Sequence, residues 1–386
     1  MTNCKENVQK AIQISSLILL LFVTILFQVQ AQDQVKAIEY FNKGVDALTQ
    51  KNYKQAIELY SLAIKEDPSY TKAYYNRANT KLTIKSYEDA INDFDLTIRQ
   101  DPDFKKAHLY KGYALMKLKM YDTAIFSYTE AIRLDPSYST AYMNRAICLM
   151  NMKKYKPASE NLRKVVELQP ENATGFYNMG LCYDKLEQFD KAALAYGNVI
   201  KINPANKKAY MAKGKALMKD KKYDLASQDF SSALQEDPNM ADAYYHRAYC
   251  KMKLKNTRAA MIDFSLALDA EPAHKSARKY RAACYLEKDL YDKALTDYQV
   301  LLKDDPENAR NHYCMGVAYL NMEKPENALE KFSDAIDLDP KLAEAYYNRA
   351  NVHVKLLHEE EACRDIKKAA ELRLPQAIEN MDKVCI

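Results

Sequence analysis

Nine of the twelve prolines are spaced at a constant interval, and this spacing constrains the fold more than any other feature of the chain. Every interval is 34 residues, with no insertion or deletion, at Pro68, Pro102, Pro136, Pro170, Pro204, Pro238, Pro272, Pro306 and Pro340. A fixed period of this length is typical of a repeat array, in which each unit packs only against its neighbours. The 386 residues therefore need not divide into separate compact domains.

Cutting the chain at this period gives ten units, which start at Ala37, Thr71, Lys105, Ser139, Ala173, Lys207, Ala241, Lys275, Ala309 and Ala343. We number the positions of a unit as columns 1 to 34. Column 20 is always Ala, column 8 is Gly or Ala, and column 24 is a large apolar residue. Apolar columns recur at helical spacings. Because a proline cannot continue a helix, each unit is predicted to be helix, turn, helix and an acidic-Pro link.

This pattern resembles the tetratricopeptide repeat (TPR) family, and unit two (TKAYYNRANTKLTIKSYEDAINDFDLTIRQDPDF) matches it column for column. The resemblance covers Ala37 to about Pro375. It implies an all-α fold, a right-handed superhelical solenoid of helix-turn-helix repeats. The family's Trp in column 4 is replaced, in one unit by Arg278, and its turn Gly in column 15 is mostly Lys. Unit nine has Pro325 in column 17. These departures affect the turns rather than the fold.

Basic residues in column 7 suggest ion pairs within the repeats. Wherever column 23 is Asp, column 7 of the same unit is basic, as in Arg77/Asp93, Lys213/Asp229, Arg247/Asp263, Arg281/Asp297 and Arg349/Asp365. We expect each pair to join the two helices of its unit. If exposed, such a pair would contribute only about 0–1 kcal/mol.

The first 31 residues have the three-part plan of a secretory signal peptide. A polar segment with Lys5 and Lys10 precedes an apolar run from Leu17 to Phe27, and Val29 and Ala31 stand at the −3 and −1 positions of a cleavage site. The alternative is a retained membrane anchor, although a spanning helix needs about 20 apolar residues. No Cys follows the run to carry a bacterial lipid anchor.

These features predict the domain organisation. Residues 1–31 form the signal peptide, 32–36 a short leader, 37–374 the ten repeats and 375–386 a capping helix. Ala377, Ile378, Met381 and Val384 share one face of that helix and would cover the end of the last repeat. We expect an exported protein of the periplasm or cell envelope, or of the secretory pathway if the source is eukaryotic.

The sequence contains none of the common motifs for catalysis or cofactor binding. The chain has no Gly-rich phosphate loop, no G-x-S-x-G elbow and no H-E-x-x-H. His353 and His358 are five residues apart, a spacing that does not place them on one helix face as a metal pair. We therefore predict no enzyme activity and no cofactor. The net charge of +5 is too small to indicate nucleic-acid binding.

The cysteines fall into two groups. Cys148, Cys182, Cys250 and Cys284 share column 10, where neighbouring units lie too far apart for disulfides, and are expected to be small buried residues. Cys363 and Cys385 lie on the last repeat and on the capping helix. In an oxidising compartment they could form a disulfide that fixes the cap; two free thiols are the alternative.

The resemblance implies that first helices line a concave face and that columns 2, 5, 9, 12 and 13 point into it. Tyr is favoured at interfaces, and aromatic residues fill column 5 in six units and column 9 in two: Phe41, Tyr75, Tyr177, Tyr245, Tyr313 and Tyr347, then Tyr113 and Tyr249. Packing between repeats is the alternative for these rings.

A basic ridge was predicted on the same face. It comprises Lys185, Lys219 and Lys253 of column 13, with Lys208 and Lys215 of unit six. The hypothesis is a groove for an acidic peptide, and a solvated charged face is the alternative. The carboxylate clamp of chaperone-binding TPR domains is absent, because neither Asn in column 9, Asn79 or Asn351, has a Lys in column 5.

The predicted function is a non-enzymatic scaffold that binds a protein or peptide in the concave groove. One alternative is a self-associating structural component of an envelope complex. Another is the same scaffold held on the membrane by an uncleaved signal, which is the one case that predicts membrane contact.

Overall fold

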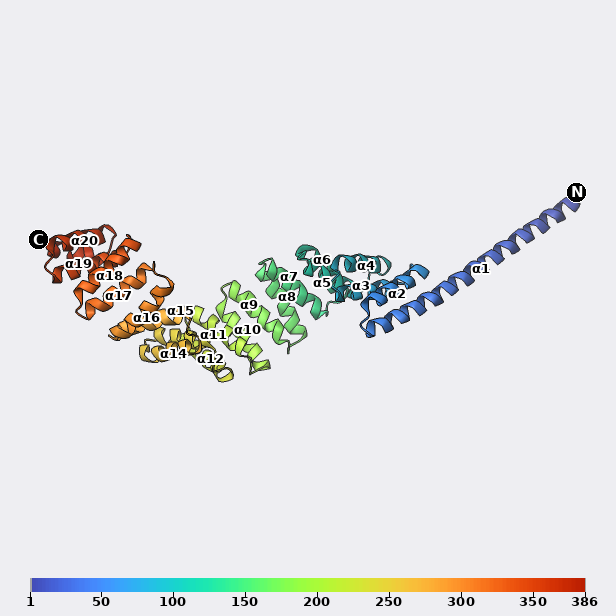
Figure 1. The fold of residues 1–386 in the computed structure, drawn as a ribbon. Coiled ribbons are helices and arrows are strands. Elements are labelled where there is room, and N and C mark those ends of the chain that lie inside the picture. Colours follow the sequence, from blue (N-terminus) through green and yellow to red (C-terminus); the bar gives the residue numbers. More distant parts are fainter. Residues whose placement is uncertain (1, 386) are drawn as a thin grey trace. The chain divides into compact units, whose positions relative to one another are not determined.

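The computed structural model describes residues 2–385, and side-chain environments for residues 17, 18, 20–22, 30 and 32–385. Every regular element in this range is an α-helix, which confirms the predicted all-α class. The chain forms two compact units, Met1–Leu186 and Glu187–Ile386 (Figure 1). The boundary falls inside the fifth repeat, whose two helices belong to different units.

The helices of the first unit are α1 (Thr2–Thr49), α2 (Tyr53–Glu66), α3 (Thr71–Thr83), α4 (Tyr87–Gln100), α5 (Lys105–Lys117), α6 (Tyr121–Leu134), α7 (Ser139–Asn151), α8 (Tyr155–Leu168) and α9 (Ala173–Lys185). Those of the second are α10 (Phe189–Ile202), α11 (Lys207–Lys219), α12 (Tyr223–Glu236), α13 (Ala241–Lys253), α14 (Thr257–Ala270), α15 (Lys275–Glu287), α16 (Tyr291–Asp304), α17 (Ala309–Asn321), α18 (Pro325–Leu338), α19 (Ala343–Lys355), α20 (Glu359–Glu371) and α21 (Pro375–Val384). Within each unit, every helix packs against the next one along the chain.

The predicted targeting segment, residues 1–31, lies mostly outside the residues whose side chains are described. Of its apolar run, Leu17, Ile18 and the segment 20–22 are described and exposed. Among the described residues, no helix is long and apolar enough to cross a membrane. Residues 32–36, predicted as a leader, continue α1, and Lys36 Nζ lies 3.8 Å from Glu66 of α2.

The core of every repeat is built from the same buried columns. The column 20 alanines are fully buried, and each column 24 side chain, such as Phe230 or Phe332, is at most 3% exposed. Burying such a side chain contributes about 1.5–3 kcal/mol. Column 8 must be small because it faces this ring. A Cβ placed on Gly316 would lie 2.6 Å from Phe332, and one on Gly214 would lie 2.8 Å from Phe230.

The turn inside each repeat adopts the left-handed conformation without glycine. Its φ values run from 57° to 64° at Lys51, Lys85, Lys119, Lys153, Glu187, Lys221, Lys255, Asp289, Glu323 and Leu357. Arg373 has the same conformation before α21, with φ of 65°. The chain therefore keeps the turn of the family while it replaces the residue that favours it. Each such position costs about 1–2 kcal/mol, which packing of the two helices must offset.

All five predicted ion pairs are present, and the carboxylates are buried rather than exposed. Arg77 donates to both oxygens of Asp93 at 2.9 and 2.7 Å, and the Asp93 side chain is 3% exposed. Each Arg also donates a hydrogen bond to a hydroxyl in the preceding repeat, and this contact was not predicted from the sequence. We call the resulting three-residue arrangement a tie. The ties are Ser61–Arg77–Asp93, Ser231–Arg247–Asp263, Ser265–Arg281–Asp297 and Ser333–Arg349–Asp365. In Thr129–Arg145–Asn161 the neutral amide oxygen of Asn161 takes the place of the carboxylate.

The tie is incomplete at Lys213 of α11. Gly197 of α10 stands where other repeats have the hydroxyl, and its missing Cβ would point into open space. Lys213 Nζ binds Asp229 Oδ1 at 2.9 Å, while the buried Oδ2 has no hydrogen-bond partner. Burial consequently raises the pKa of Asp229 above its ordinary value, although Lys213 opposes the shift.

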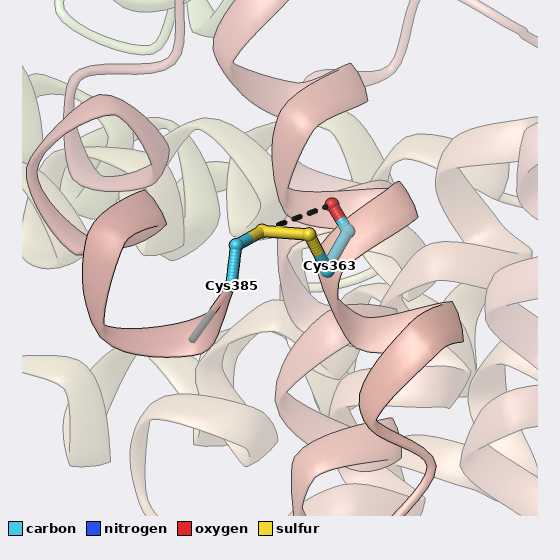
Figure 2. Close-up of a disulfide and its surroundings, with 2 residues drawn as sticks. All are labelled: Cys363 and Cys385. Atoms are coloured by element: carbon cyan, nitrogen blue, oxygen red, sulfur yellow. Dashed lines mark hydrogen bonds between the residues drawn. A yellow bond between two sulfur atoms is a disulfide. The ribbon is translucent and has the colours of Figure 1, made fainter.

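The helix α21 covers the end of the last repeat. Ala377 is buried, and Met381 and Val384 pack with Ile366, whereas Ile378 is exposed. Cys363 of α20 and Cys385 form a disulfide with a Cα–Cα distance of 4.8 Å, shown in Figure 2. The four column 10 cysteines are buried and free.

Candidate functional site: the inner helix face

The first helices of successive repeats define the inner side of each unit. Besides the sequential packing, α3 contacts α5 and α5 contacts α7 in the first unit. In the second unit α11 contacts α13, α13 contacts α15, and α17 contacts α19. Neighbouring repeats therefore lie closer together on the side of their first helices. The columns of the first helices that face away from the second helices form a concave surface within each unit.

A hollow of about 450 Å³ lies on this side between α3 and α5. It is lined by Asn79, Leu82 and Thr83 of α3 and by Tyr110 and Tyr113 of α5. We refer to it as the α3–α5 hollow. Tyr110 stacks on the buried Phe94 with ring centroids 6.4 Å apart, which fixes its position in the wall. Its walls combine apolar rings with amide and hydroxyl groups.

The electrostatics of the hollow favour an anionic group. Lys117 Nζ lies 5.1 Å from the centroid of the Tyr113 ring, so an exposed ammonium stands beside the hollow. Asn79 forms a side-chain hydrogen bond with the hydroxyl of Tyr75, whose pKa is raised by burial despite this bond. Asn79 is thereby held in place, with further hydrogen-bonding capacity.

The column 5 aromatics predicted as binding residues lie half-buried in contacts within and between repeats. Phe41 lies 5.1 Å from Tyr70 of its own repeat, all distances being between ring centroids. Tyr75 lies 6.3 Å from Tyr110, and Tyr245 lies 6.0 Å from Tyr280, each in the next repeat. The hydroxyls of Tyr313 and Tyr347 accept hydrogen bonds from Asn348 and Asn380. Tyr177 is likewise half-buried. Packing thus accounts for much of their surface, and burial raises the pKa of Tyr245 to about 12.

Each of the two column 9 tyrosines has a lysine ammonium near its ring. Tyr249 repeats the arrangement of Tyr113, with Lys253 Nζ 5.3 Å from its ring centroid. The lysines of the predicted ridge are all exposed: Lys185, Lys208, Lys215, Lys219 and Lys253. Lys185 belongs to the first unit and the other four lysines belong to the second. Lys219 Nζ lies 5.3 Å from the Phe189 ring centroid.

Most of the hollow was not predicted from the sequence. Tyr113 was predicted to bind a partner, but Asn79, Leu82, Thr83 and Tyr110 were not. Three of these occupy columns 9, 12 and 13, which the resemblance already placed on the concave face. Tyr110 lies in column 6 and had no such indication. Among the described residues, no three His, Cys, Asp or Glu side chains come together as ligands for a metal ion.

The fold and the concave surface define a class of protein, the helical repeat scaffold. Models described as "Tetratricopeptide repeat" match residues 41–103, 106–138, 139–172, 173–206, 211–270, 259–309 and 343–374, and one described as "TPR repeat" matches 323–356. Together they cover most of the chain, which therefore belongs to the tetratricopeptide repeat family. Proteins with this fold serve as scaffolds for protein–protein interaction, and they bind protein or peptide partners.

Solved structures of TPR proteins are similar to parts of the chain. The C-terminal part of a TPR repeat-containing protein from Cytophaga hutchinsonii has a TM-score of 0.55 and 19% identity, over 61% of this chain and 97% of that one. YrrB, described as a TPR protein with an unusual peptide-binding site, has 24% identity and a TM-score of 0.45, over 49% and 97%. MamA has 26% identity and 0.42, over 45% and 94%. Among curated proteins, no significant sequence match was found.

Proposed function

We propose that this protein is a non-enzymatic scaffold that binds a protein or peptide through the inner face of its repeats, with the α3–α5 hollow as a principal contact. The hollow is the observation that supports this function, because it presents aromatic rings, an amide and hydroxyls on the concave side. Binding sites for flexible ligands combine apolar contact area with a few fixed polar groups in this way. The Asn79 amide can bond an extended peptide backbone, which carries both donors and acceptors.

The charge of this surface favours an acidic partner. In repeats two to four, the columns predicted to face the groove contain Lys72, Lys106 and Lys117 and no Asp or Glu. All three lysines are exposed. Exposed charges act mainly on association rate and specificity. Acidic residues of the partner would therefore be attracted by these lysines and guide the partner into the groove, and contacts in the hollow would hold it there.

We also propose that the protein acts outside the cytoplasm, in the periplasm or cell envelope. The signal-like residues 1–31 and the Cys363–Cys385 disulfide support this location, because disulfides persist in oxidising compartments. Cleavage after Ala31 would leave residues 32–49 as the first helix of repeat one. Mass spectrometry of the protein from its native cells tests this step. A chain that begins at Gln32 supports export with cleavage, and an intact N-terminus would point to membrane retention.

Affinity capture from native cells tests the binding function. The full-length chain is compared with a groove variant, Asn79→Ala with Tyr110→Ala, and with a control, Phe126→Ala. Phe126 lies on the second helix α6 and is 68% exposed, so its loss should leave the fold and the inner face intact. A partner kept by the control and lost by the groove variant would support the proposal. A partner retained equally by all three chains, or recovery of the chain's own copies alone, would count against groove binding.

The charge hypothesis has its own test, applied to the captured partner. Lys117→Glu reverses the ammonium beside Tyr113, and Lys119→Glu makes the same charge change in the following turn. We expect the first variant to weaken binding several-fold more than the second, and the difference to shrink at high salt. Equal effects of the two variants would show that net charge alone matters.

A further inference from the structure

Two histidines at the last repeat lie closer together than their sequence spacing indicated. His353 is in the last turn of α19, and His358 is the N-cap residue of α20. Leu357, with φ of 62°, reverses the chain between them. Their Nδ1 atoms are 3.3 Å apart, with ring centroids at 5.5 Å. The five-residue spacing gave no indication of this contact, because it was considered along one continuous helix.

The distance between the two nitrogens suits a tetrahedral metal ion. With metal–nitrogen bonds of about 2.0–2.1 Å and tetrahedral angles, two imidazole ligands hold their nitrogens about 3.3 Å apart. The Nδ1 atoms of His353 and His358 have this separation. Both nitrogens could therefore reach one bound ion at their present distance.

A buried carboxylate lies beside one of the two rings. The Nε2 atom of His353 lies 3.9 Å from Oδ2 of Asp365, whose side chain is 7% exposed. Arg349 fixes that carboxylate with hydrogen bonds of 2.7 and 2.9 Å. The negative charge favours the proton on Nε2 and leaves the lone pair on Nδ1, directed toward His358. Carboxylates near the second ring nitrogen are common around metal-binding histidines.

The surroundings allow a cation to enter. His358 is exposed, and its side chain makes no capping hydrogen bond to α20. The first turn of that helix carries Glu359, Glu360 and Glu361, and Glu361 is close enough to interact electrostatically with His353. An ion at the two nitrogens would thus be open to water and near negative charge.

We propose that His353 and His358 form a two-histidine site for a divalent transition-metal ion. Imidazole nitrogens favour zinc, nickel and copper, and water would complete the coordination because no third ligand side chain joins the pair among the described residues. The site joins the end of α19 to the start of α20 and is independent of the inner face. His274 offers no such site, because its Nδ1 accepts from the backbone N–H of Ala277 and its Nε2 faces Asp242.

Calorimetric titration of the full chain with Zn²⁺ and Cu²⁺ tests this site, with His358→Ala as the variant and His108→Ala as the control. His358 is exposed and its side chain caps no helix, so its removal should not disturb folding. His108 lies in the first unit, far along the chain from the proposed site, and binds the carbonyl of Pro102 in the same unit. We expect saturable binding near one equivalent, tighter for Cu²⁺ than for Zn²⁺. The affinity should fall about tenfold or more in His358→Ala and be unchanged in His108→Ala.

A second measurement identifies the ligands. Electron paramagnetic resonance of bound Cu²⁺ should show two imidazole nitrogens in the full chain and one in His358→Ala. Equal affinity in the two chains would overturn the proposal. So would the absence of saturable binding, which would leave the two rings as a hydrogen-bonded pair only.

Discussion

Arg247 of α13 donates two hydrogen bonds to Asp263 of α14, at 2.8 Å from Nε to Oδ2 and at 2.7 Å from Nη2 to Oδ1. Its Nη1 donates to Ser231 of the preceding repeat at 3.2 Å. One side chain thus joins the two helices of its own repeat and ties that repeat to its neighbour. Because stability in a repeat array depends on the interfaces between neighbours, these ties contribute to the cooperativity of the array.

Replacing Arg247 should therefore be costly. In Arg247→Met the buried Asp263 carboxylate, 2% exposed, would keep only Lys251 as a charged partner. We expect a loss of about 3 kcal/mol in the free energy of unfolding, measured by urea denaturation. The control is Lys43→Met, which removes the exposed pair with Glu39 and should have no measurable effect. Equal losses in the free energy of unfolding for the two variants would mean that the buried tie stabilises the fold no more than an exposed ion pair.

The incomplete tie at Lys213 can be rebuilt. Gly197→Ser with Lys213→Arg restores the residues that other repeats carry, and a Cβ at position 197 meets no atom within 4 Å. We expect the free energy of unfolding to rise by about 1–2 kcal/mol, from the new hydrogen bonds and from replacing a helical glycine. Gly197→Ala alone should give only the helix contribution, about 0.5–1 kcal/mol. A double variant no more stable than Gly197→Ala would contradict the assigned role of the hydroxyl.

Acid should destabilise the second unit through His246. Burial, and secondarily the charge of Lys215, lowers the pKa of His246 from its ordinary value of 6.5 to about 4. Because the unfolded chain binds the proton more readily, this contribution to stability is complete above pH 6.5 and is lost as the pH falls toward 4. The maximum loss is about 3 kcal/mol.

The variant His246→Asn isolates this effect. Asn occupies the same column in other repeats, at Asn76 and Asn144 for example, and it does not titrate. Urea unfolding between pH 7.5 and 4.5 should show a smaller loss of stability in the variant than in the natural chain. Parallel curves for the two proteins would show that His246 does not contribute.

The disulfide should hold the capping helix rather than the array as a whole. Cys385→Ser opens a loop closed over a sequence separation of 22 residues, and we expect α21 to lose about 3 kcal/mol of protection against opening. Hydrogen exchange of the backbone amides in α21 measures this local free energy. The amides of α17 should exchange as before. Cys314→Ser, which removes a free thiol, is the matched control and should leave α21 unchanged.

The architecture could be predicted from sequence because it depends on local, repeated contacts. The 34-residue period, the alanines of column 20 and the rings of column 24 define one helix pair, and repetition gives the rest of the fold. The pairing of Arg247 with Asp263 could also be predicted, since both residues recur at fixed columns. Its tie to Ser231 could not, because that contact crosses between repeats and column 25 varies.

The turns show how tertiary packing can override a local preference. Lysine at column 15 casts doubt on the turn, yet Lys85 and Lys119 adopt φ values of 64° and 62° because the packed helix pair requires this conformation. The same turn accounts for the histidine pair. His353 and His358 meet only because Leu357 reverses the chain, which a spacing of five residues along a helix cannot reveal.

The candidate site was the least predictable part of the molecule. The concave columns were known from the family resemblance, but whether a tyrosine in them faces solvent or packs between repeats depends on its neighbours. Tyr75 packs against Tyr110 of the next repeat, for example, while Tyr113 borders the hollow. Asn79 and Tyr110 come together because α3 and α5 pack side by side. The residue type in one column cannot predict a contact between different columns of two repeats.

Site-specific photo-crosslinking in native cells tests the central claim most directly. A photoreactive phenylalanine analogue is placed either at Tyr113, in the α3–α5 hollow, or at Phe126, on the exposed face of α6. Occupation of the inner face by a partner predicts a specific heterologous crosslink from position 113 that is absent from position 126. A crosslink to a partner from position 126 alone, or crosslinks only between copies of this chain, would contradict it.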